Sequence, residues 1–194
     1  KGNAVAYVAS VVLHAPHAAA KAVADQHWAC PLAATIYEVR VTPGKAGRLS
    51  ADALTPSARS PGGLLRALSG LGDAKVLYRM DQAVRLSGDR VRIGSSVPWV
   101  TSRRDTGGGR FVNTVQYQSV GAILNVAGVP SPDGSISAEL ELEVSSLTDS
   151  AVEISPKLPA TIMRKTLLAC NGPIRPGRAV VVVTLDAGAP DAKG

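Results

Sequence analysis

Aromatic residues are scarce in this sequence, and long apolar runs are missing. Its 194 residues include four tyrosines, two tryptophans and one phenylalanine, so valine, alanine and leucine must supply most of the core. No apolar run approaches the ~20 residues that a membrane-spanning helix needs. There is also neither an initial methionine nor a charged-then-apolar signal segment, so we expect that the chain was trimmed at Lys1.

Charge is modest and dispersed along the chain. Apolar residues make up 45% and charged residues 19% of the sequence, which is typical of a globular chain and not of a disordered one. The net charge of +6 is compatible with an anionic partner. However, the basic residues are scattered and are not interleaved with aromatic residues, so we expect no nucleic-acid partner.

Histidine is rare, which limits the chemistry available. The three histidines are His14, His17 and His27, and with Cys30 they form an H-x2-H-x9-H-x2-C spacing that resembles a zinc site. His14 ends an apolar segment, and alanine and proline surround the first pair, so we favour no metal site. The sequence contains no Ser-His-Asp arrangement that we can place and no G-x-S-x-G motif. We therefore expect a protein that is not an enzyme and that needs no cofactor.

The first third of the chain mixes strands and helices. A helix is predicted from Pro61 to about Gly70, because Ser60 is a good N-cap, proline suits the first helical position, and leucines follow at helical spacing. The alternation in TIYEVRV at 35–41 predicts a half-buried strand. The remaining predictions are a buried strand at 4–14, an alanine-rich helix at 17–27 and a loop at 42–60.

From Lys75 onward the sequence reads almost entirely as β-strands. Turns are predicted at 87–89 and at 131–134, where Ser-Gly-Asp and Ser-Pro-Asp-Gly separate strand-like runs. The order of strand, helix and then long antiparallel strands predicts an α+β fold that is mainly β. These runs exceed the usual five or six residues of a strand, which favours a barrel or an extended sheet.

One strand, at 136–147, alternates clearly between apolar and polar residues. Its polar face carries Glu139, Glu141 and Glu143. On a monomer this would be a solvated sheet face. The alternative is that the acidic face lines a water-filled lumen while the apolar face packs outward.

A polar segment at 101–110 interrupts two strand-like runs. It contains Arg103, Arg104 and Asp105, followed by the triplet Gly107, Gly108 and Gly109. Glycine gives up backbone order, and charge keeps the segment hydrated, so we expect a ten-residue loop. No Lys-Ser or Lys-Thr helix start follows, which argues against a phosphate-binding loop.

Several segments, in their order and spacing, resemble the secretin family, the outer-membrane channel proteins of type II and related secretion systems. The resemblance runs from about Ala34 to Asp186. It includes a V-x-I-G-x-x-V-P segment carried by Val91, Ile93, Gly94, Val97 and Pro98. A second run is VGAILNVAGVP at 120–130, which is followed by GSISAELELEVSS at 134–146.

The resemblance implies functions for the polar segment and for two glycines. In secretins the hairpin after the Val-Pro segment belongs to an inner gate, so 101–110 would be the gate tip. Gly94, Val97, Pro98 and Gly121 would then form the gate strand and its hinge. The alternative for Gly121 is an ordinary β-bulge.

The resemblance also implies an assembly and a location. The chain would be a subunit of a many-subunit homo-oligomeric ring, a (double) β-barrel channel in the bacterial outer membrane. Its partners would be outer-membrane lipid, secreted protein, pilus or phage cargo, and periplasmic secretion components. Residues 34–194 would be the secretin-type β domain, and 1–33 a small αβ segment that is a remnant of a periplasmic ring module.

The count of strands supports a ring independently. About four strands remain for an outer wall, and four cannot enclose a channel. Unpaired valine-rich edges would seek partners. The alternative is a structural or interaction β domain of the cell envelope without a pore. Cys30 and Cys170 permit one disulfide in an oxidising compartment, or they stay as two buried thiols.

Overall fold

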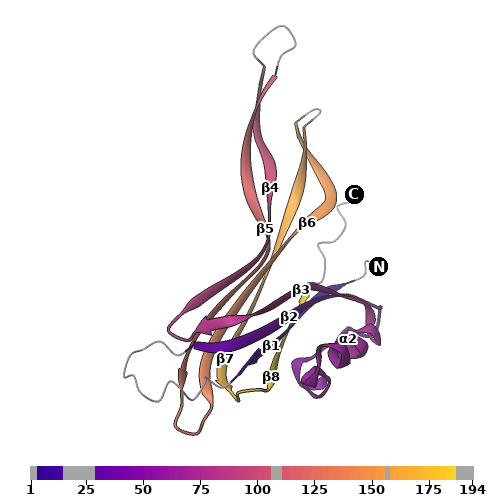
Figure 1. The fold of residues 1–194 in the computed structure, drawn as a ribbon. Helices are drawn as coiled ribbons and strands as arrows, with labels where there is room; N and C mark the ends of the chain where they lie inside the picture. The colour runs from indigo at the N-terminus through magenta and orange to yellow at the C-terminus, as the bar shows by residue number, and fades with distance from the viewer. Residues whose placement is uncertain (1–3, 15–28, 106–110, 156–157, 187–194) are drawn as a thin grey trace. The chain divides into compact units, whose positions relative to one another are not determined.

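The computed structural model describes residues 4–14, 29–105, 111–155 and 158–186, most of which lie in two β-sheets (Figure 1). The helix expected at 17–27 lies outside these residues, and the mainly β class with two short α-helices is confirmed. The described strands are β1 (Val5–Leu13), β2 (Ala29–Val41), β3 (Gly72–Arg85), β4 (Asp89–Asp105), β5 (Phe111–Pro130), β6 (Ile136–Ser155), β7 (Leu158–Ile174) and β8 (Ala179–Asp186). The helical segments are η2 (Ala46–Arg48), α1 (Ala51–Leu54), η3 (Thr55–Arg59) and α2 (Pro61–Ser69).

The first sheet has the strand order β3-β2-β1-β8, and each neighbouring pair is antiparallel. Val8 of β1 lies opposite Tyr37 of β2 on one side and opposite Val183 of β8 on the other. The last described strand therefore pairs with the first. The domain boundary suggested between residues 33 and 34 falls inside β2, and residues on both sides of it pair with β1 and β3.

Helix α2 begins where the sequence predicts. The side chain of Ser60 accepts a hydrogen bond from the backbone N–H of Gly63 at 3.1 Å, and Pro61 is the first helical residue. Both features satisfy or remove N–H groups that have no partner inside the first turn. The hydroxyl of Tyr37 on β2 donates to the carbonyl of Pro61 at 3.1 Å, which joins the helix start to the sheet.

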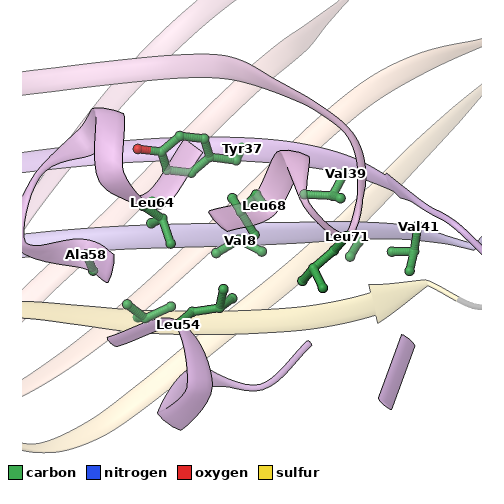
Figure 2. Close-up of a cluster of buried hydrophobic side chains, with 11 residues drawn as sticks. Val8, Tyr37, Val39, Val41, Leu54, Ala58, Leu64, Leu68 and Leu71 are labelled. Carbon is green, nitrogen blue, oxygen red and sulfur yellow. The ribbon is translucent and has the colours of Figure 1, made fainter. Parts of the chain in front are cut away.

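One face of the first sheet is covered by this helix and its neighbours. Leu64 and Leu68 of α2 are fully buried, as are Val8 and Val39 on the sheet face below them. Figure 2 shows these side chains gathered between the helical layer and the strands. The leucine spacing read from the sequence therefore identifies the packed side of α2.

The segment at 42–60 is more ordered than the predicted loop. It contains η2, α1 and η3, and so the prediction of a loop is wrong for much of its length. Ser50 explains α1, because its side chain accepts the N–H of Ala53 at 3.3 Å, and Asp52 lies in the first turn. A serine N-cap with an acid behind it favours even a short helix.

The opposite face of the first sheet is also buried, as is one face of β6 in the second sheet between Ile136 and Val144. Leu13, Leu32 and Ile36 are fully buried on the first sheet. The second sheet has the order β4-β5-β6-β7, and on β6 the alternate residues Ile136, Ala138, Leu140, Leu142 and Val144 are buried, as the apolar alternation predicts.

The chain divides into two compact units. Unit 1 comprises Lys1–Val91, Leu124–Leu142 and Leu167–Gly194, and so it holds the first sheet and adjoining stretches of the second. Unit 2 comprises Arg92–Ile123, the β4–β5 arm, and Glu143–Thr166, the β6–β7 arm. Strands of the second sheet therefore run through both units.

Both predicted turns are confirmed. Between β3 and β4, Gly88 has a φ of +122°, and the N–H groups of Arg85 and Arg90 donate to the Asp89 carboxylate at 3.2 and 2.9 Å. Between β5 and β6, Gly134 has a φ of +79°. Only glycine adopts these conformations without a steric penalty, so the turn residues fix where each hairpin reverses.

We expect Leu68→Ala to lower the free energy of unfolding by about 2–5 kcal/mol, because it leaves a cavity under the helix. Leu65→Ala on the same helix is the control, since Leu65 is only partly buried. Urea unfolding of both variants measures the difference. A loss for Leu68→Ala no greater than that for Leu65→Ala would contradict the assignment of the buried face.

Candidate functional site

Part of the segment predicted as a gate-tip loop is strand. β4 continues to Asp105, so the loop prediction is wrong for residues 101–105. The reason is that polar side chains do not stop two strands from pairing. The Thr101 hydroxyl donates to the Thr114 carbonyl at 3.2 Å, and the Ser102 hydroxyl donates to the Thr114 hydroxyl at 3.0 Å. The structure describes neither residues 106–110, which include Gly107, Gly108 and Gly109, nor the side chains of Arg103 and Asp105. Arg104 is exposed.

The β4–β5 arm carries exposed apolar side chains. Val100 on β4 is exposed, and so are Val112, Val115 and Tyr117 on β5, with Tyr117 at 72%. Successive strand residues point to opposite faces, so Val112 and Val115 lie on different sides of the ribbon. The arm in the single chain therefore offers apolar surface on both faces, which a two-stranded ribbon in water does not favour. Closer to the start of this arm, Val97 is half-buried and Pro98 is exposed.

Gly94 on β4 and Gly121 on β5 approach each other closely. A Cβ placed on Gly94 would collide with the carbonyl oxygen of Val120 and would lie 2.8 Å from the Cα of Gly121. A Cβ placed on Gly121 would collide with the carbonyl oxygen of Ile93 and would lie 2.6 Å from the Cα of Gly94. Their φ angles are +156° and +150°. Both the conformation and the contact therefore require glycine on both strands.

A third strand reaches the same point through Ser145 of β6. The Ser145 hydroxyl oxygen accepts a hydrogen bond from the N–H of Gly121 at 3.0 Å. The hydroxyl proton can be donated to the carbonyl of Gly121 at 3.2 Å or to that of Ser119 at 3.5 Å. Ser145 is 6% exposed, so water does not readily replace these bonds. Gly94, Gly121 and Ser145, hereafter the glycine–serine crossing, all belong to unit 2.

A groove of about 220 Å³ follows the crossing. It is lined by residues 92–95 of β4, 119–123 of β5 and Ser145 of β6. The resemblance directed attention to Gly94 and Gly121, and the structure brings them together. Sequence reasoning missed Ser145. Ser145 lies in the segment 134–146 that resembles secretins, but no function could be assigned to it from the sequence, because its partner Gly121 is brought close only by the fold.

Glu139, Glu141 and Glu143 share one side of β6, and two of these carboxylates have a hydrogen-bond or ion-pair partner. In unit 1, the Asn125 amide donates to Glu141 at 2.9 Å, and the Arg90 guanidinium donates to the Asn125 carbonyl oxygen at 2.8 Å, whereas Glu139 is exposed. A groove of about 520 Å³ runs along this polar row. In unit 2, Glu143 forms an ion pair with Lys165 at 2.8 Å.

The two cysteines hold free thiols. Cys30 lies on β2 of the first sheet and is fully buried, and burial raises the pKa of its thiol. Cys170 lies on β7 of the second sheet and is half-buried. The structure therefore has two free thiols, one on each sheet, of which only Cys30 is fully buried.

Neither a metal site nor a membrane-spanning helix is found in the described part of the chain. Within those residues, no group of three or more histidine, cysteine or acidic side chains is placed to hold a metal ion. No helix among them has the length and apolar character to cross a membrane. Of the zinc-like spacing, His17 and His27 lie outside the described residues.

Comparison with known proteins finds a secretin. No protein-family model matches the chain. Over 75 residues the chain is 36% identical to Secretin PulD of Klebsiella pneumoniae. The matched segment covers 39% of this chain and 11% of that protein, so the chain spans far less than two thirds of its relative's length.

We predict that Gly121→Ala destabilises the protein by about 1–3 kcal/mol more than Gly172→Ala. The two glycines have nearly the same φ, +150° and +151°, but a Cβ on Gly172 meets nothing within 4 Å. The pair therefore separates the steric collision at the crossing from backbone strain alone. Denaturant unfolding measures both, and equal losses would show that the close approach of β4 and β5 has no energetic weight.

We predict that Cys170 reacts with a maleimide at pH 8 well before Cys30. A raised pKa leaves a smaller thiolate fraction at that pH, and burial also blocks the reagent. Mass spectrometry of the wild type and of a Cys170→Ser control assigns each label, and Cys30 should react only after unfolding. Similar rates for both thiols, or resistance of both without reductant, would contradict this arrangement.

Proposed function

We propose that this chain is the channel-forming part of a secretin-type subunit, which assembles as a many-copy ring in the bacterial outer membrane and exports protein, pilus or phage through a gated pore. The observation that carries the proposal is the 36% identity to a secretin over 75 residues. It accords with the order of motifs from Ala34 to Asp186. The chain acts in this proposal by shape and not by catalysis, and needs no cofactor.

The open sheets support a ring. Each sheet has four strands, and the edge strands are β3 and β8 in the first and β4 and β7 in the second. Unpaired edges present backbone N–H and C=O groups that favour another strand. Because neighbouring strands alternate in direction, the β7 edge of one copy can pair antiparallel with the β4 edge of the next. The same holds for β8 and β3, and repeated pairing in a ring leaves no edge open.

The distribution of charge supports a water-filled interior for such a ring. Glu139, Glu141 and Glu143 share the face of β6 opposite its buried apolar residues. Carboxylates are strongly disfavoured in lipid or in a packed core, but they are tolerated in water. The second sheet would thus form the wall, with its polar side toward the lumen and repeated acidic rings around it.

The β4–β5 arm supports a gate within that channel. Its apolar residues, such as Val115 and Tyr117, are exposed in one chain and would be covered by arms of neighbouring copies. The Gly94–Gly121 contact would be the hinge, and the glycines at 107–109, with Arg103, Arg104 and Asp105, would be the tip. The cargo would displace the arms as it passes. Outer-membrane lipid and periplasmic secretion components would be the other partners.

We expect the purified chain to form particles of at least about ten copies, because a lumen that passes a folded cargo needs many times the four strands that one copy supplies. Light scattering on detergent-purified protein gives the mass, and electron microscopy should show rings. The matched measurement after denaturation gives the mass of one chain. A stable monomer or dimer with the same β content would refute the pore and favour a structural module of the envelope.

A further inference from the structure

The glycine–serine crossing gives Ser145 a task that neither glycine can perform. Gly94 and Gly121 have no side chains, so nothing interdigitates where β4 and β5 meet. At that same point the Gly121 N–H is turned toward β6, where the Ser145 hydroxyl accepts it at 3.0 Å. A side chain thus supplies a hydrogen bond between β5 and β6 at this residue.

The Ser145 hydroxyl also has two alternative acceptors on β5. Its single proton can go to the Gly121 carbonyl at 3.2 Å or to the Ser119 carbonyl at 3.5 Å. The two carbonyls lie two residues apart along the same strand. One hydroxyl can therefore keep a bond to β5 while this strand shifts slightly, and it loses both bonds only after a larger displacement.

We infer that Ser145 is a latch that holds the β4–β5 arm to β6 at the glycine–serine crossing, and that release of its hydroxyl is a step in the opening of the gate. The release step rests on the proposed channel function. The latch itself concerns one hydrogen-bonded position and needs no pore. Ser145 is in this sense a positioning residue, because it acts through the backbone of Gly121.

The test of the latch is amide hydrogen exchange at Gly121 in the full chain, in the state in which it is purified. Ser145→Ala removes the acceptor and should speed exchange of the Gly121 amide about tenfold, because that N–H loses its partner in a buried site. Exchange at Val39 in the first sheet should stay unchanged. Ser146→Ala is the matched control, since Ser146 is adjacent and no hydrogen bond of its side chain is described. Ser145→Thr keeps the hydroxyl and should restore slow exchange.

The outcomes are separable. Faster exchange at Gly121 alone supports the latch, whereas equal acceleration at Gly121 and Val39 would mean that Ser145 contributes only general stability, and would overturn it. Unchanged exchange at Gly121 would overturn it as well.

The second measurement is permeability of cells to a large antibiotic. If the latch controls the gate, Ser145→Ala raises permeability while ring assembly and the Ser146→Ala control stay at wild-type levels. Local release at Gly121 with intact rings and unchanged permeability would refute the gating step but keep the latch. Absence of rings in the wild type would refute the proposed channel itself.

Discussion

The requirement that strand backbones find hydrogen-bond partners underlies the rest of this structure. Among the residues that the structure describes, two four-stranded antiparallel sheets satisfy their interior strands and leave β3, β8, β4 and β7 with one unpaired side each. The helical layer on the first sheet buries side chains such as Leu64 and Leu68, but burial of a face does nothing for an edge. In the proposed ring, these edges would pair with the edges of neighbouring copies.

At the glycine–serine crossing, the strands are held together differently from the rest of the sheet. Along β6 from Ile136 to Val144, side chains alternate between a buried and a polar face, and burial fixes the register. At Gly94 and Gly121 no side chain is present to define a face, and two backbones come into direct contact. The register of the strands there depends on hydrogen bonds of the Ser145 hydroxyl and not on apolar packing.

Features determined by neighbouring residues could be predicted from the sequence. The start of α2 follows from Ser60 and Pro61, and the faces of β6 follow from strict alternation. The extension of β4 through Thr101 and Ser102 could not, because it depends on Thr114 across the hairpin. Ser145 was missed for the same reason: its partner Gly121 is distant in sequence, and only the fold brings them together. Motif resemblance selected the two glycines but gave no account of why both must be glycine.

The pairing of β1 with β8 has a consequence for how the chain reaches this state. β1 is an interior strand of the first sheet, and Val8 on it lies opposite Val183. One of its two partner strands, β8, therefore comes from nearly the last described residues. During synthesis, β1 can pair with β2 early, while its other side waits for β8. Contacts between such distant segments carry a large loop-closure entropy and form slowly. A nascent chain therefore carries a valine-rich strand with one open side until β8 has been made, which is a window for aggregation.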